Sequence, residues 1–491
     1  MRKPILVLFV AGILAMPLSG WAATPPAPEG YHRTGGSTLV PGVEHIRFER
    51  QGKQSVNVAH ISRDAEVALR PVSSFGTIAG RGGRVERTSA MCARVDCLAA
   101  INGDFFAGGV PVGAFASGGE LLRSPKGKHH ALMIGQDRAL TAGQVAWSGK
   151  LVSTDLQEIA LDGINIPRRQ NEAVLYTTPF APTTLTNPHG AELVLRFVAP
   201  KGRRPRIGET AIVRMVSFKW GKGDSKIPTD GAVLSAHGRA ANALESIWRA
   251  VQRDDASRDA LLRIDTKADV LEAIGGSPIL LRDGAIWVAN EDRAFVRSRA
   301  PRTVVGWNEA GDTWLVTIDG RQPGFARGMS LLEAAKLVRA LGATDAINLD
   351  GGGSTTFVVR GDVVNRPSDR LGSVDGVSQI LRSVAPGVSA RNLERPVANA
   401  LVVLAPGTNT RPARQQPTLE MEMPEVETVA LPAPSQSDPA SNPVAALPAI
   451  VATPPDAESS RAAPIGLAML VNAAVALALF RRAGIRIVAR P

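Results

Sequence analysis

The pattern of apolar and polar positions between about residues 40 and 404 is dominated by short runs typical of β-strands. The segment TVVGWNEAGDTWLVTIDG, residues 303–320, predicts two strands joined by a loop that contains Asn308 and Gly311. The segment TTFVVRGDVV, residues 355–364, predicts a second hairpin with Arg360-Gly361-Asp362 as its turn. The pattern therefore indicates a domain built mainly from antiparallel strands.

One segment has a clear helical period instead. Ser330 and Glu333 have the spacing of a capping box, and the apolar positions at 331–341 fall on one helical face. Gly342 supplies a helix stop, and a strand is expected directly afterwards at 345–350. We therefore expect an α+β fold with a mixed, mostly β core and a few packing helices, in a single catalytic domain at 40–404.

The N-terminal segment has the features of a secretory signal. Arg2 and Lys3 precede an apolar run, and small residues at Ala22 and Ala23 suit signal peptidase, which predicts a signal peptide at 1–23. An uncleaved membrane anchor is the alternative. Proline-rich composition predicts linkers at 24–39 and at 405–461.

The C-terminal segment predicts a membrane anchor. Residues 462–480 are nearly all apolar and are followed by a basic tail at 481–491, which fits the positive-inside pattern. A surface or core helix is the alternative. Together the two ends predict an exported protein on the periplasmic or extracellular face, anchored to the inner membrane.

The amino-acid composition restricts the classes of molecule that this protein is expected to bind. The formal net charge of +11 favours an anionic partner, whereas 4% aromatic residues and the absence of a nucleic-acid-binding motif argue against nucleic acid. Cys92 and Cys97 are the only cysteines, and in an exported chain such a pair is typical of a disulfide, with two free thiols as the alternative.

Three predicted strands end in polar residues followed by glycine. The first presents Asn102 and Asp104, the second Asp319 and Arg321, and the third Asp350 before Gly351, Gly352, Gly353 and Ser354. Consecutive glycine amides can form a nest that binds anions, although each of these sites also fits an ordinary turn. If the strand ends converge beside Arg302, the carboxylates and arginines would suit a phosphorylated sugar.

Other catalytic patterns are missing from the sequence. The glycine run lacks the lysine of a phosphate-binding loop, and neither H-E-x-x-H nor G-x-S-x-G occurs. His129 and His130 lie among lysines, which we interpret as a solvated loop.

The motifs INGDFF, GGSPILLRDG, RTVVGW, the block at 319–356 and VNRPSD occur in an order that resembles the phosphodiester glycosidase family, over about residues 95–404. The resemblance implies an exported or luminal α+β hydrolase that cleaves a sugar from a phosphodiester. It implies a site made of Asn102, Asp104, Arg302, Asp319, Arg321, Asp350, Gly351, Gly352, Gly353, Ser354, Asn365 and Asp369. An insertion at 370–393 departs from the family pattern.

Glycosidases commonly use two carboxyl groups, and Asp350 with either Asp319 or Asp104 is the pair we expect. Arg302, Arg321, Ser354 and the glycine amides would bind the phosphate, with Asn365 and Asp369 as a second wall. No cofactor is required in this scheme, although a divalent cation held by Asp350 remains an alternative. A phosphodiesterase that breaks the P–O bond and a polysaccharide-binding envelope protein without activity also remain open.

Overall fold

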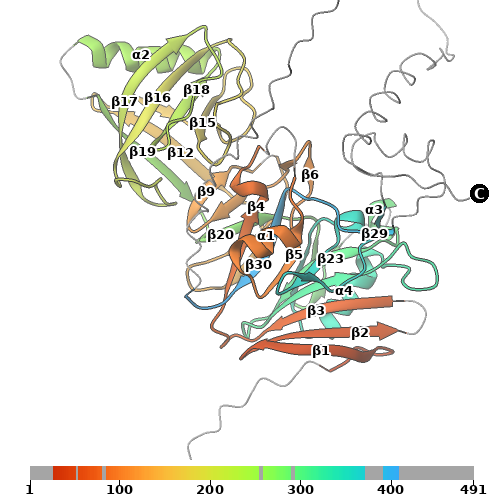
Figure 1. Cartoon of the computed structure of the whole chain (residues 1–491). Helices are drawn as coiled ribbons and strands as arrows, with labels where there is room; N and C mark the ends of the chain where they lie inside the picture. Colours follow the sequence, from red (N-terminus) through yellow and green to blue (C-terminus); the bar gives the residue numbers. More distant parts are fainter. Residues whose placement is uncertain are drawn as a thin grey trace, which may run out of the picture. The chain divides into compact units, whose positions relative to one another are not determined.

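The computed structural model describes residues 26–50, 54–79, 85–125, 127–253, 258–288, 294–370 and 391–407, all within one compact unit (Figure 1). The predicted signal peptide and the predicted C-terminal helix lie outside these residues. No helix in the described part of the chain has the length and apolar character needed to cross a membrane.

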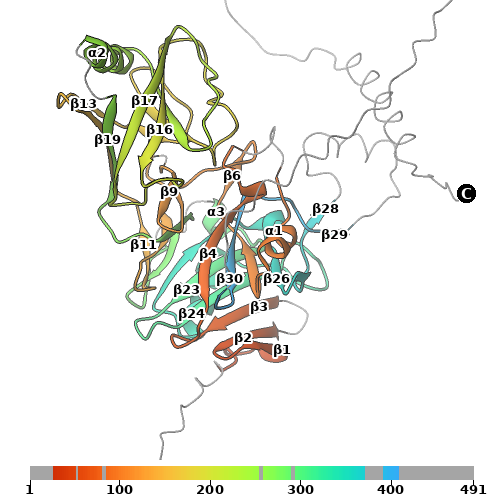
Figure 2. The same cartoon turned by 60° about the vertical axis from the view of Figure 1, so that its left-hand side comes forward.

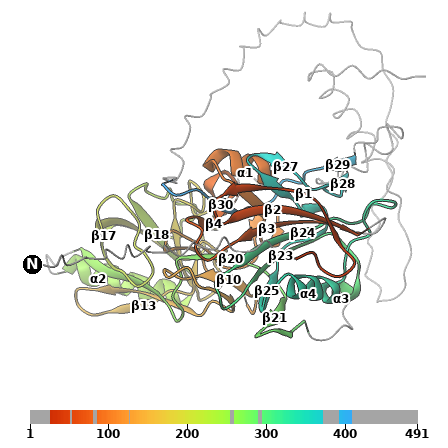
Figure 3. The same ribbon diagram turned by 90° about the horizontal axis from the view of Figure 1, so that it is seen from below.

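The first sheet is antiparallel and carries the strands of the best-marked sequence motifs. In spatial order its strands are β1 (His32–Val40), β2 (Val43–Arg50), β3 (Gln54–Ile61), β24 (Thr313–Ile318), β23 (Arg302–Trp307), β25 (Asp345–Asn348), β21 (Ile279–Arg282) and β22 (Ala285–Ile286). Helices α3 (Ala294–Arg297) and α4 (Leu331–Ala340) pack on one face, where Leu331, Ala335 and Val338 join the apolar core (Figure 3).

The second sheet packs against the other face of the first. Its strands are β27 (Asp362–Val363), β26 (Phe357–Val359), β5 (Ala99–Asn102), β30 (Asn399–Leu404) and β4 (Ala68–Ser73). Leu315 and Ile347 of the first sheet share one buried cluster with Ile101 and Leu401 of the second, so the two sheets form a sandwich. Helix α1 (Thr88–Val95) packs against the second sheet.

The remaining strands form two further sheets. One contains β11 (Leu140–Gly143), β10 (Ala131–Ile134), β20 (Glu272–Gly275), β8 (Phe115–Ser117) and β9 (Glu120–Arg123). The other contains β13 (Glu158–Ala160), β12 (Trp147–Ser153), β19 (Asp259–Thr266), β17 (Thr210–Trp220), β16 (Ala191–Ala199), β18 (Gly231–Ala236), β15 (Ala173–Thr177) and β14 (Gly163–Ile164). Helix α2 (Arg239–Arg253) covers this last sheet (Figure 2).

Short elements complete the fold. They are the hairpin of β6 (Phe106–Ala107) and β7 (Val110–Pro111), the ladder of β28 (Asp369–Arg370) and β29 (Arg391–Leu393), and the 3-10 turns η1 (Ser74–Gly76) and η2 (Gly352–Ser354). Cys92 and Cys97 form a disulfide at the end of α1, with an S–S distance of 1.98 Å.

The expected fold class is confirmed, because the structure is mostly β with few helices. The hairpin of β23 and β24 forms in the predicted place, and so does that of β26 and β27. The capping box of α4 is complete: Ser330 Oγ accepts from the Glu333 amide at 3.2 Å, and Glu333 accepts from the Ser330 amide at 2.8 Å.

The predicted N-terminal linker is wrong over its second half. Residues 32–40 form the edge strand β1, which is paired with β2 along its whole length. Most of its side chains are exposed, so the backbone hydrogen bonds to β2 hold it rather than a buried apolar face. A prediction based on composition does not detect such a strand.

Candidate active site

The ends of β5 and β25 meet where the two sheets of the sandwich come together. The Asn102 side chain donates to the Asp350 carbonyl oxygen at 2.6 Å, and the Asp350 amide donates to the Gly103 carbonyl at 2.9 Å. Asn102 Oδ1 accepts from Thr303 at 2.7 Å and from the Thr356 amide at 3.1 Å. Asn102 is therefore buried as a fixed support for the backbone at Asp350.

The Asp350 carboxyl at this junction has a raised pKa. Burial raises the pKa of Asp350 to about 6, and the negative charge of Asp104 raises it further. Ser354, Arg395 and the Gly351 amide oppose this rise in pKa. The buried Ser354 hydroxyl makes no hydrogen bond of regular geometry within the described residues, so its effect is that of a nearby dipole. The Asp350 carboxyl is thus mainly ionised at neutral pH but easily protonated.

Asp104 forms a buried pair with His129. Its Oδ1 lies 3.0 Å from His129 Nε2, while Oδ2 accepts from the Gly113 amide at 2.6 Å. A Cβ atom on Gly275 would stand 2.3 Å from the carboxylate, so glycine is needed there for close packing. The interpretation of His129 as part of a solvated loop is wrong, because its side chain is only 15% exposed and is oriented by Asp104.

Asp319 is buried and fully engaged by the surrounding protein. Its carboxylate accepts from Ser55 at 3.0 Å, from the Asn365 side chain at 3.0 Å and from the Arg366 amide at 3.1 Å. Burial raises the pKa of Asp319 to about 6. Asn365 also donates to the Thr355 carbonyl, so this network ties the end of β24 to the glycine turn.

Arg302 is directed into the protein rather than toward a ligand. Its guanidinium donates to the carbonyls of Met329 at 3.0 Å, Phe295 at 3.1 Å and Ser298 at 2.6 Å, and it lies over the Phe295 ring. Burial lowers the pKa of Arg302 to about 10, and the charge of Arg321 lowers it further. In the structure Arg302 therefore binds backbone carbonyls, and the predicted contact with a phosphate is not seen.

The glycine turn is a single 3-10 turn with arginines on two sides. Gly352 has φ +64°, and a Cβ there would lie 3.0 Å from the Arg321 guanidinium. A Cβ on Gly353 would lie 2.4 Å from Arg395, whose guanidinium also binds Asp369 through two hydrogen bonds of 3.0 Å. Close approach of two guanidinium groups thus explains why the turn lacks side chains.

Three amides of the glycine turn are already bonded to backbone carbonyls. The amide of Gly352 donates to the Pro301 carbonyl outside the turn, and those of Ser354 and Thr355 donate to Gly351 and Gly352 within it. An anion beside this turn would therefore meet guanidinium groups rather than a row of free amides.

The residues that the sequence singled out come together only in part. Asn102, Asp104 and Ser354 lie beside Asp350. Asp319, Arg302 and Asn365 instead bind neighbouring parts of the protein. His129 and Arg395 were missed. Among the described residues, no group of three or more His, Cys, Asp or Glu is arranged to hold a metal ion.

Buried carboxyl groups with raised pKa values beside arginines are typical of the active sites of hydrolases. Residues 208–404 match the family model of phosphodiester glycosidases, which confirms the resemblance seen in the motifs. This part of the chain is thus similar to the phosphodiester glycosidase family.

Curated relatives support this assignment. N-acetylglucosamine-1-phosphodiester alpha-N-acetylglucosaminidase of Bos taurus is 34% identical over 120 residues, which is 22% of this chain and 22% of the relative. The enzyme of Mus musculus is 32% identical over 159 residues, or 29% of this chain and 30% of the relative. The chain thus matches less than a third of the length of these relatives.

Two solved structures share the fold. A hypothetical protein from Synechocystis has a TM-score of 0.53 at 20% identity and covers 74% of this chain and 62% of its own. A putative exported protein from Burkholderia pseudomallei has a TM-score of 0.50 at 24% identity, with coverage of 73% and 74%.

Proposed function

We propose that this protein hydrolyses the glycosidic bond of a sugar-1-phosphodiester and releases the free sugar and a phosphomonoester. The observation that carries this proposal is the position of Asp350, whose pKa of about 6 arises beside the Asp104–His129 pair and beside the turn flanked by Arg321 and Arg395. The family match gives the reaction class, and these residues give it a chemical basis.

In the proposed reaction, water adds to the anomeric carbon while the bond between that carbon and the phosphate oxygen breaks. The phosphate keeps the electron pair. Asp350 stabilises the positive charge that develops on the sugar, as carboxylates do in glycoside hydrolysis. Because a phosphomonoester is a good leaving group, the main requirement on that side is charge stabilisation, which Arg321 and Arg395 supply.

His129 transfers the proton in this scheme. Asp104 fixes the orientation of the imidazole through Nε2 at 3.0 Å, which leaves Nδ1 to exchange a proton with water or with the leaving phosphate. Asp319, Asn365 and Arg302 are positioning residues, because their contacts hold the glycine turn and the segment before β23. This assignment replaces Asp319 by the Asp104–His129 pair as the partner of Asp350.

The cellular setting belongs to the same proposal. The predicted signal peptide at 1–23 and the predicted anchor at 462–480 would place the domain outside the inner membrane, in the periplasm or at the outer face. Substrates there include phosphodiester-linked cell-wall polymers and exopolysaccharides. The positive net charge of +11 favours such anionic glycans.

The test is hydrolysis of a panel of sugar 1-(methyl phosphate) diesters in water enriched in heavy oxygen. We expect the label in the sugar and complete loss of turnover in Asp350→Asn. Asp230→Asn, which removes an exposed carboxylate paired with Arg196 in another sheet, is the matched control and should retain full activity.

Three results would overturn the proposal. Label found in the phosphate identifies P–O cleavage by a phosphodiesterase. Binding of polysaccharide without any released product identifies a non-catalytic envelope protein. Full turnover in Asp350→Asn removes the proposed carboxylate from the reaction. Loss of activity on chelation would add a divalent cation to the scheme.

A further inference from the structure

A cavity lies away from the candidate active site, at the opposite ends of the same strands. It has a volume of about 820 Å³, within the usual range for small-molecule sites, and Trp307, Thr313 and Asp345 line it. These residues end β23, begin β24 and begin β25, whereas Arg302, Asp319 and Asp350 belong to the other ends of these strands. The length of the central sheet thus separates the two sites.

Charged groups of both signs line this cavity. The bases are Arg63, Arg70, Arg138 and Arg282, and the acids are Asp137, Glu272, Asp283, Glu309 and Asp345. Arg70 and Glu272 form an ion pair of 3.2 Å and compensate each other. The remaining acidic and basic side chains nearly balance in charge, so the net charge of the cavity selects neither an anion nor a cation.

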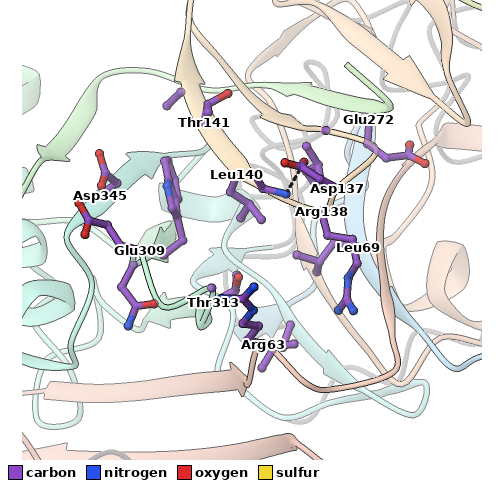
Figure 4. Close-up of a pocket in the computed structure, with 18 of the residues that line it drawn as sticks. Arg63, Leu69, Asp137, Arg138, Leu140, Thr141, Glu272, Glu309, Thr313 and Asp345 are labelled. Atoms are coloured by element: carbon purple, nitrogen blue, oxygen red, sulfur yellow. Dashed lines mark hydrogen bonds between the residues drawn. The ribbon is translucent and has the colours of Figure 1, made fainter. Parts of the chain in front are cut away.

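Two of the charged side chains that line the cavity are not engaged in contacts with the rest of the described protein. Within the described ranges, the side chains of Arg63 and Glu309 make no hydrogen bond or ion pair, although the Arg63 amide donates to Asp312. Figure 4 shows Glu309 and Asp345 on one side of the space, and Leu69, Leu140 and Arg138 across from them. Donors, acceptors and apolar surface therefore face one another across the same opening.

From this combination we propose that the cavity binds neutral sugar units. A sugar hydroxyl both donates and accepts, so it is satisfied by carboxylates and guanidinium groups placed side by side. The apolar faces of a sugar ring suit Val67, Leu69 and Leu140, which also line the opening. This proposal does not rest on the hydrolase activity, since it concerns residues that play no part in the proposed reaction.

The test is saturation-transfer NMR of the full chain with glucose, galactose, mannose and N-acetylglucosamine at millimolar concentration. Thr141 is exposed on β11 and lines the cavity, so Thr141→Trp fills the opening without disturbing the core. We expect at least one sugar to bind, with affinity reduced about tenfold or more in Thr141→Trp and weakened in Glu309→Ala. Ser148→Trp, at an exposed position of β12 outside the cavity, is the matched control and should bind as the unmodified chain does.

Four results would overturn the proposal. The first is no binding of any of the four sugars, and the second is binding that Thr141→Trp leaves unchanged. The third is binding lost in Asp350→Asn but kept in Thr141→Trp, which would place the sugar in the active site. The fourth is that no sugar binds, while inorganic phosphate or calcium chloride raises the melting temperature of the unmodified chain but not that of Thr141→Trp. The hydrolysis assay reports on the candidate active site alone. A negative result for sugar binding in the cavity therefore does not contradict the proposed hydrolase activity.

Discussion

Replacing Asp350 by asparagine should remove activity and make the folded protein more stable at neutral pH. Burial raises the pKa of Asp350 to about 6 from a reference of 3.8, so the folded state binds the proton more tightly than the unfolded state does. Stability therefore falls as the pH rises from the unfolded to the folded pKa, and the whole cost is present above that range. The asparagine side chain carries no charge and avoids this cost.

The size of the expected stabilisation follows from the pKa shift of Asp350. A difference of about two pKa units corresponds to roughly 3 kcal/mol at most, since one unit is about 1.4 kcal/mol. This net shift already includes the favourable contacts that the carboxylate makes with Ser354, Arg395 and the Gly351 amide. An ordinary hydrogen bond contributes about 0.5 to 1.5 kcal/mol, and asparagine does not reproduce those of a protonated carboxyl in full, so the net gain should be about 1 to 3 kcal/mol.

Urea unfolding at about pH 8 and about pH 4 measures this difference directly, with hydrolysis assayed on the same samples. The midpoint for Asp350→Asn should be higher than that of the unmodified chain at the upper pH and the same or lower at the lower pH. Asp369→Asn is the control of opposite sign, because it removes the negative charge and one of the two oxygens that accept from Arg395, and it should destabilise the fold.

A loss of stability in Asp350→Asn at the upper pH as large as that in Asp369→Asn would contradict a desolvation cost at Asp350. An equal gain in stability at both pH values would contradict it too, because a proton-linked cost decreases as the carboxyl becomes protonated in both states.

Three further predictions concern the same site. Gly353→Ala places a Cβ 2.4 Å from the Arg395 guanidinium and should reduce kcat/KM at least about tenfold; unchanged kinetics would show that this arginine does not bind the substrate. His129→Gln should lower kcat by about a hundredfold with melting unchanged, and a normal kcat would remove the proton-transfer role. The kcat/KM of the unmodified chain should fall as the pH drops below about 6, where Asp350 becomes protonated; a profile flat across this range would contradict the requirement for an ionised carboxylate.

The sequence predicted the local elements well because their signals are local. The capping box of α4 and the hairpins β23–β24 and β26–β27 depend on residues within a few positions of one another. The convergence of Asn102 and Asp350 was also foreseeable, since each follows an apolar strand and ends it with a polar group. Edge strand β1 was missed because backbone pairing, rather than side-chain burial, holds it.

The roles within the site were harder to predict, since they depend on long-range packing. His129 lies just before β10, and the pairing of β10 with β20 places it near Gly275, which packs against the Asp104 carboxylate that follows β5. The sequence suggested a phosphate ligand at Arg302, but the carbonyls of Phe295, Ser298 and Met329 surround its guanidinium. Arg395 lies between β29 and β30, and its contact with Asp369 likewise depends on long-range packing.

The ladder of β28 and β29 brings Asp369 opposite Leu393, so the chain leaves the site and returns to it at neighbouring positions. The pairing of Asp369 with Arg395 reinforces this arrangement from one side. For protein engineering, the two paired strands therefore offer fixed attachment points. A short turn grafted between β28 and β29 should leave Asp369 and Leu393 in register.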